Sequence, residues 1–170
     1  MSRATIVALV LVTAALLQTT LFPYLMLVGF RPDLLLLVTA VFALREGALA
    51  GLRIGFAAGI LTDLLLHQSP VGLSALVYLG VGYTIGLARP YLAPESVTAP
   101  VIMAFLSGLL GTAGYGLLSR LLGDERYTMA LVLQASLFVA LYNTLLAPIV
   151  SGIVSRLGRR FPLEGAPAPR

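Results

Sequence analysis

The chain has no cysteine, no lysine and only one histidine, His67. Without cysteine it can form neither a disulfide nor a thiolate metal site, and a lone histidine has no second one with which to build a metal site. Charge is also scarce, since only 11% of the 170 residues are charged, whereas about 25% are charged in a typical soluble domain. With 59% hydrophobic residues and a mean hydropathy of +0.99, the composition predicts a protein that crosses the membrane several times.

Six apolar runs are candidates for membrane spans, each of which needs roughly 20 residues. The runs cover residues 4–22, 32–44, 47–66, 72–88, 97–119 and 129–155. The first run resembles a signal peptide, but the further spans downstream favour a retained anchor. The second run has only 13 residues, so it must tilt, thin the bilayer or be shielded by protein. Pro148 predicts a kink in the last run.

We therefore predict an all-α fold: one polytopic membrane domain of six transmembrane helices, residues 1–160, followed by a disordered cytoplasmic tail, residues 161–170. The arginines predict its orientation. If the amino terminus is cytoplasmic, eight arginines lie inside and three lie outside, namely Arg31, Arg120 and Arg126. This distribution satisfies the positive-inside rule and places both termini in the cytoplasm.

A ladder of glycines marks the third run. Gly47, Gly51, Gly55 and Gly59 occupy every fourth position. Small residues at this spacing allow the backbones of two membrane helices to approach closely. Two uses remain open: packing inside the bundle, which is the default because many polytopic proteins pack in this way, and a cleft for the transmembrane helix of a partner.

Two carboxylates stand out because charge within a membrane is costly. Asp33 follows Arg31 and Pro32 at the start of the second run, where a proline and an acidic residue suit the first turn of a helix; a partner contact is the alternative. Asp63 lies about 24 Å along its helix, close to the outer interface. Its carboxylate is expected either to reach headgroup water or to pair with Arg31 or Arg120.

The sequence gives little support for catalysis. His67 and Ser74 are seven residues apart, but no acidic residue completes a catalytic triad. We expect no enzymatic activity, no cofactor, no metal and no nucleic-acid ligand, and we attribute the net charge of +4 to membrane orientation.

Three motifs occur in a fixed order along the chain: residues 31–37 (Arg-Pro-Asp-Leu-Leu-Leu-Leu), residues 59–65 (Gly-Ile-Leu-Thr-Asp-Leu-Leu) and residues 70–72 (Pro-Val-Gly). Together with chain length and the number of spans, they resemble MreD, the rod shape-determining membrane protein family. The resemblance implies a non-catalytic subunit of the peptidoglycan elongation machinery in the bacterial inner membrane. Its direct partner would be an MreC-like single-span protein, linked to a RodA-like polymerase, a penicillin-binding transpeptidase and MreB.

The MreD family is also similar in fold to the S-components of energy-coupling-factor transporters. The alternative function is therefore a small-molecule-binding membrane subunit of a transporter. Such a subunit needs convergent polar groups in a pocket. The sequence shows few of them beyond the charges at the outer face, so we favour a protein partner.

We predict a scaffold in which the second and third spans, with the turn at 67–72, form a glycine-lined cleft for the partner's helix. Charges on the outer face would fix the register of that helix. The candidate residues are Pro32, Asp33, Gly51, Gly55, Gly59, Asp63, Pro70 and Gly72.

Overall fold

Six α-helices make up most of the computed structural model, which describes residues 3–21, 24, 29–65, 71–92 and 98–160. The helices are α1 (Arg3–Thr20), α2 (Leu34–Glu46), α3 (Ala48–Leu65), α4 (Leu73–Ala88), α5 (Thr98–Leu121) and α6 (Met129–Arg160), with the short 3-10 helix η2 (Arg89–Tyr91) after α4. The predicted all-α fold is confirmed. Pro70, His67 and the tail at 161–170 lie outside the described residues.

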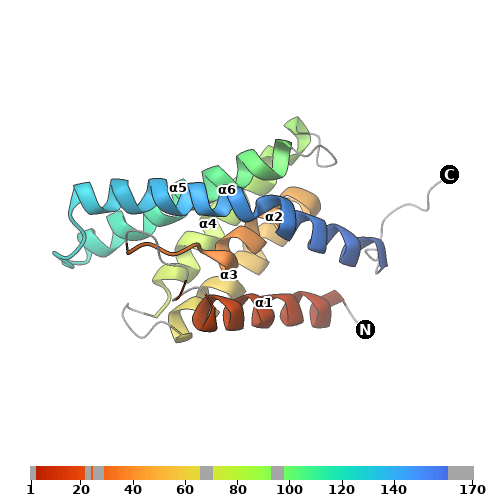
Figure 1. The fold of residues 1–170 in the computed structure, drawn as a ribbon, viewed down its shortest axis with the longest axis horizontal. Helices are drawn as coiled ribbons and strands as arrows, with labels where there is room; N and C mark the ends of the chain where they lie inside the picture. The colour runs from red at the N-terminus through yellow and green to blue at the C-terminus, as the bar shows by residue number, and fades with distance from the viewer. Residues whose placement is uncertain (1–2, 22–23, 25–28, 66–70, 93–97, 161–170) are drawn as a thin grey trace.

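The short helix α2 forms the centre of the bundle. Every side chain from Leu34 to Leu44 is buried, and α2 packs against each of the other five helices. In Figure 1, α1 lies on one side of α2 while α5 and α6 lie on the other. A helix of 13 residues is therefore tolerated here because protein shields it from lipid, which was one of the three expected solutions.

Four helices, α1, α3, α5 and α6, are long and apolar enough to cross a membrane. The helices α2 and α4 are shorter, with 13 and 16 residues. The outward surface of α6 is apolar, with Leu133, Leu137, Leu141 and Leu145 all exposed at four-residue intervals. Large exposed apolar surfaces are rare on proteins in water, whereas lipid tails cover them in a bilayer. The helices thus fit a membrane protein.

The bundle has two ends, which we name the Glu46 end and the Asp33 end. At the Glu46 end, Arg3 of α1 forms an ion pair with Glu46 of α2, and Arg45 donates a hydrogen bond to Ser155 of α6. The start of α1 and the end of α6 thus lie at the same end of the molecule (Figure 1). A chain that crosses a membrane an even number of times has its two ends on the same side, and this arrangement agrees with that rule.

The glycine ladder packs α3 directly against α4. A Cβ atom added to Gly51, Gly55 or Gly59 would lie within 3.0 Å of backbone atoms of α4, and one added to Gly82 of α4 would meet the backbone of Gly51. The expectation of internal packing is confirmed for these glycines. The expected open cleft on this face is wrong, because α4 already fills it.

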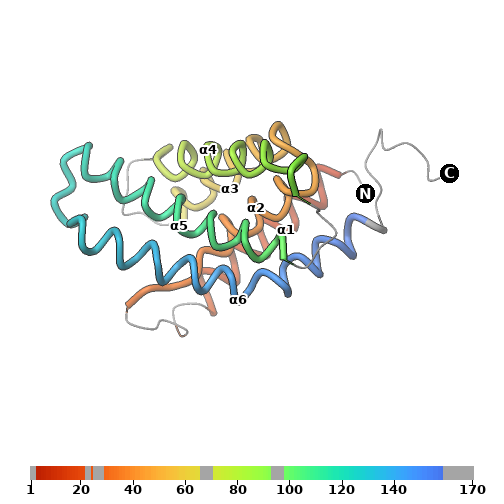
Figure 2. Tube along the Cα trace, turned by 90° about the horizontal axis from the view of Figure 1, so that it is seen from above, coloured from red at the N-terminus to blue at the C-terminus, as the bar shows by residue number. Residues whose placement is uncertain are grey.

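The helices α5 and α6 form a second close pair. A Cβ atom on Gly108 of α5 would lie 2.6 Å from the Cα atom of Ala140 of α6. The helix α6 continues through Pro148, and its axis bends partway along its length (Figure 2). A proline inside a helix removes one backbone hydrogen bond and favours such a bend.

Candidate functional site

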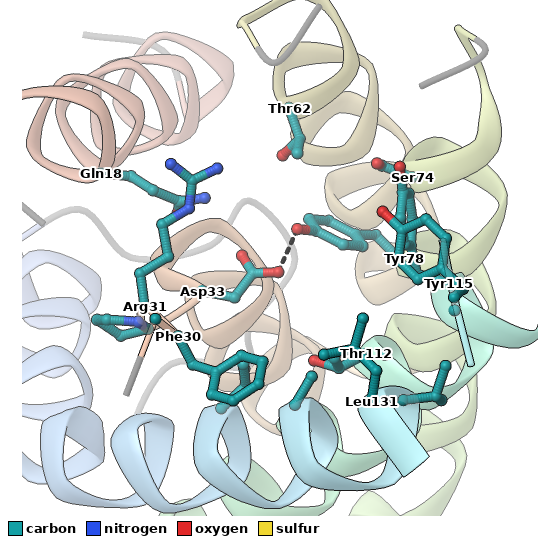
Figure 3. Close-up of a pocket in the computed structure, with 18 of the residues that line it drawn as sticks. Gln18, Phe30, Arg31, Asp33, Thr62, Ser74, Tyr78, Thr112, Tyr115 and Leu131 are labelled. Atoms are coloured by element: carbon teal, nitrogen blue, oxygen red, sulfur yellow. Dashed lines mark hydrogen bonds between the residues drawn. The ribbon is translucent and has the colours of Figure 1, made fainter. Parts of the chain in front are cut away.

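A cavity of about 700 Å³ opens at the Asp33 end of the bundle (Figure 3). Its walls come from α1, α3, α4, α5 and α6 and from residues 29–33, which lead into α2. Small-molecule sites usually measure about 300–1,000 Å³, so the cavity has the size of a ligand site. Its polar lining residues are Gln18, Arg31, Asp33, Thr62, Ser74, Tyr78, Thr112, Tyr115 and Tyr127.

Asp33 connects three helices at the floor of this cavity. It is the N-cap of α2, where its Oδ1 atom accepts the backbone N–H of Leu36 at 3.1 Å, so the predicted role at a helix start is confirmed. Its Oδ2 atom accepts a hydrogen bond from the hydroxyl of Tyr78 on α4 (Figure 3). Its own N–H donates to the Oδ1 atom of Asn143 on α6 at 3.1 Å. Pro32, which precedes it, is buried.

Asn143 of α6 is a buried polar residue next to Asp33. Its side chain is fully buried, and its Nδ2 atom has no hydrogen-bond partner among the described residues. A buried amide with an unused donor is uncommon, because the lost hydration is not compensated. Its hydrogen bond from the backbone N–H of Asp33 joins α6 to the start of α2.

Gln18 and Arg31 form the edge of the cavity next to α1. Gln18 is only 6% exposed, and its Oε1 atom accepts the backbone N–H of Leu35 at 3.1 Å. In Figure 3 the guanidinium of Arg31 lies beside the side chain of Gln18. The ion pairs found among the described residues lie elsewhere, so Arg31 brings a positive charge to the cavity without a salt-bridge partner there.

Two tyrosines line the opposite side. The rings of Tyr115 on α5 and Tyr127 in the loop before α6 meet edge to face, with centroids 5.8 Å apart. Burial, with a further contribution from Tyr115, raises the pKa of Tyr127 to about 12. The phenol of Tyr127 is therefore protonated at neutral pH and can act as a hydrogen-bond donor.

The remaining walls differ in character. Thr62 on α3 and Thr112 on α5 contribute hydroxyl groups, and the hydroxyl of Thr62 donates to the carbonyl of Ala58 at 2.9 Å, which leaves its oxygen able to accept. The wall from α6 is apolar and consists of Leu131, Val132, Ala135 and Val139. The cavity thus has polar groups on most sides and one apolar wall.

Asp63 lies beside the cavity and caps α4. It is 3% exposed, and its carboxylate accepts the backbone N–H groups of Gly72 at 2.7 Å, Ser74 at 3.2 Å and Ala75 at 3.4 Å. The first N–H groups of a helix have no partner within it, so an acidic side chain here satisfies them and interacts favourably with the helix dipole. The described residues show no ion pair between Asp63 and either Arg31 or Arg120, and the carboxylate is buried, so both expectations for Asp63, headgroup water and one of these ion pairs, are wrong.

The predicted residues divide into groups with different roles. Pro32 and Asp33 line the cavity. Asp63 and Gly72 form the adjacent cap of α4, and the φ angle of +104° at Gly72 is one that glycine adopts readily. Of the ladder, Gly51, Gly55 and Gly59 lie in the α3–α4 contact instead, and Gly47 lies before α3.

Most of the cavity lining was not predicted from the sequence. Gln18, Tyr78, Tyr115 and Tyr127 were not selected, and the expectation of few polar groups was wrong. Each of these residues is isolated within or beside a different apolar segment, and only the packing of the helices brings them together. Gln18 carried the one usable signal, since a polar amide inside an uncharged span suggests a functional or packing role.

A family model for the rod shape-determining protein MreD matches residues 2–157, which is nearly the whole chain. The chain belongs to the MreD family. The resemblance noted from the three motifs is thereby confirmed, and MreD membership implies a role in determining rod shape. MreD is a family of shape-determining structural proteins and is not known for enzymatic activity. No protein with a curated description matches the chain.

Proposed function

We propose that this MreD protein is a non-catalytic scaffold subunit of the peptidoglycan elongation complex and binds an MreC-like single-span protein. The observation that carries the proposal is the family match over residues 2–157. Through its direct partner the protein would be linked to a RodA-like polymerase, a penicillin-binding transpeptidase and MreB. In this role it maintains cell shape by holding components together in the membrane.

We further propose that all six helices cross the bacterial inner membrane with both termini in the cytoplasm. The positions of the arginines support this orientation. Arg3, Arg45 and Arg89 gather at the Glu46 end, where the guanidinium of Arg89 lies close to Gly47. Arginine-rich ends face the cytoplasm, so the Glu46 end is assigned to the cytoplasm and the Asp33 end to the opposite side.

The partner's helix needs a surface that the bundle leaves open. The centre of α2 is buried, and the glycine face of α3 is filled by α4, so neither is available. The outward face of α4 carries Gly80, Thr84 and Ala88 at four-residue intervals, and a Cβ atom added to Gly80 would meet nothing within 4 Å. Small residues at this spacing favour close helix contact in membranes. We assign the docking surface to this face of α4.

Hydrogen bonding at Thr84 is compatible with that assignment. Its hydroxyl donates to the carbonyl of Gly80 at 2.8 Å, so no unsatisfied donor faces the lipid or the partner. Gly152 on α6 also has open space around it, but its neighbours at the same spacing are Pro148 and Arg156. A proline and an arginine do not allow the same close approach.

The assignment predicts a difference between two matched glycine variants. Gly80→Leu should reduce copurification of the MreC-like partner at least tenfold, because leucine holds the partner's backbone away from α4. Gly152→Leu makes the same change on an open face of α6 and should leave copurification unchanged. Equal recovery of the partner with Gly80→Leu and with the parent protein would contradict the proposed surface.

A second candidate function is a small-molecule-binding subunit similar to transporter S-components. The observation that favours it is the polar cavity at the Asp33 end. The two functions differ in the part of the molecule that each one needs. A scaffold loses function when the α4 surface is blocked, whereas a binding subunit loses function when the cavity is filled.

A further inference from the structure

We propose that the cavity at the Asp33 end binds an amphipathic organic phosphate that carries a net negative charge. In this arrangement Arg31 holds the phosphate, the surrounding hydroxyl groups hold further oxygen atoms of the ligand, and its apolar part lies against α6. The proposal goes beyond the scaffold function and does not depend on which partner the protein binds.

Charge at the cavity points to an anion. The carboxylate of Asp33 already accepts two hydrogen bonds, from the N–H of Leu36 and from the hydroxyl of Tyr78, and it sits at the positive end of α2. These donors and the helix end stabilise its negative charge, and Arg31 also acts on it electrostatically without forming a salt bridge. The guanidinium of Arg31 has no salt-bridge partner among the described residues, so it supplies the charge that a ligand can neutralise.

The donors around Arg31 favour a phosphate over a carboxylate. A guanidinium offers five N–H donors in a planar fork that matches phosphate oxygens. Thr112, Tyr115 and Tyr127 line the same cavity with further hydroxyl groups, whereas the hydroxyl proton of Tyr78 is already donated to Asp33 (Figure 3). A phosphate ester presents several acceptor oxygens to such a set, whereas a carboxylate presents two.

The wall from α6 explains why the ligand should also have an apolar part. Leu131, Val132 and Val139 contribute no polar side-chain atom, and Phe30 extends this apolar surface, where its ring stacks on that of Phe138 with centroids 5.5 Å apart. A cavity of about 700 Å³ is also far larger than a phosphate ion needs. The shared chemistry is that of a glycerol phosphate, which can arrive as a lipid headgroup or as a soluble ester.

Binding can be measured with the purified full chain in a neutral detergent, without any partner protein. The chain has no tryptophan, so its fluorescence comes from tyrosine, and three of its seven tyrosines line the cavity. The probes are dihexanoyl phosphatidylglycerol, dihexanoyl phosphatidylcholine and glycerol 3-phosphate. We expect saturable binding of phosphatidylglycerol, with a rise in Tm, and at least tenfold weaker binding of phosphatidylcholine, which is net neutral and lacks headgroup hydroxyls.

Two pairs of matched variants locate the binding site. Arg31→Gln should weaken binding at least tenfold, whereas Arg53→Gln, which removes an exposed arginine of α3 outside the cavity, should not. Ala135→Phe fills the cavity without removing a polar group and should abolish binding. Gln134→Phe places the same ring at the neighbouring exposed position and should leave binding intact.

The outcomes separate cleanly. Tighter binding of the lipid than of glycerol 3-phosphate, with both lost in Arg31→Gln, supports the proposal, and binding of the lipid alone assigns the ligand to the membrane. Binding of glycerol 3-phosphate as tight as that of the lipid would show that the apolar wall contributes nothing and would overturn the amphipathic ligand. The proposal is overturned if neither phosphatidylglycerol nor glycerol 3-phosphate binds, or if phosphatidylcholine binds as tightly as phosphatidylglycerol. It is also overturned if Arg31→Gln and Ala135→Phe bind as tightly as their controls. Since no partner is present, these results are independent of the copurification experiment with Gly80→Leu.

Discussion

The carboxylate of Asp63 at the end of α3 accepts the backbone N–H of Gly72 at 2.7 Å and so caps the helix that follows. The side chain reaches across the connection between two helices and satisfies three amides at the start of α4. Because α3 and α4 are also in backbone contact along the glycine ladder, this cap fixes one end of the closest helix pair in the molecule.

Replacement of Asp63 tests the capping role. Asp63→Leu leaves three amides near the start of α4 without their acceptor, and an unsatisfied buried donor costs about 1–3 kcal/mol. We expect a clear loss of Tm in detergent, and a smaller loss for Asp63→Asn, which keeps one acceptor oxygen. Coupling to Arg31 or Arg120 in a double-mutant cycle would instead indicate an ion pair, and its absence supports the cap.

The glycine ladder gives a second prediction. Gly55→Ala places a Cβ atom against the backbone of Tyr78, and such overpacking costs about 1–3 kcal/mol. The yield of monodisperse protein in size-exclusion chromatography should fall sharply. Gly80→Ala, on the same pair of helices but facing outward, should give the yield of the parent protein. Equal yields for the two variants would show that α3 and α4 are not in backbone contact.

The hydrogen bond between Tyr78 and Asp33 predicts a coupling across the cavity. Tyr78→Phe removes the donor to a charged acceptor, which is worth about 1.5–3 kcal/mol. In a double-mutant cycle with Asp33→Asn, thermal or chemical denaturation should give a coupling free energy above about 0.5 kcal/mol. Tyr83→Phe, at an exposed position of α4, is the control and should show no coupling with Asp33→Asn.

The absence of native cysteine makes the proposed orientation directly testable. Leu122→Cys lies in the exposed loop after α5, at the Asp33 end, and Tyr91→Cys lies in η2 after α4. In intact cells an impermeant thiol reagent should label Leu122→Cys and should not label Tyr91→Cys until the membrane is opened. Labelling of Tyr91→Cys from outside would reverse the orientation.

Sequence patterns predicted the helices well, because apolar runs between breakers define membrane helices with little help from tertiary structure. The run predicted at 32–44 is α2, which extends from Leu34 to Glu46. The central position of α2 could be predicted only in part. The short length of the run indicated shielding from lipid by protein as one solution, but nothing in the run showed that five helices surround it.

The role of the ladder could not be decided from sequence, because a glycine face looks the same whether its neighbour belongs to the same chain or to a partner. The structure decides it for Gly51, Gly55 and Gly59, which contact α4. The cavity was harder to predict. Its polar groups come, one or two at a time, from four helices and two connecting segments, so no local pattern joins Gln18 to Tyr127.

The central claim is that the helix of an MreC-like partner lies on the outward face of α4. A photo-crosslinking amino acid at Leu76, which is exposed one step before Gly80 on this face, measures the contact directly in cells. We expect a crosslink to the partner from this position and none from the equally exposed Leu141 on α6. A crosslink from Leu141 with none from Leu76 would contradict the claim.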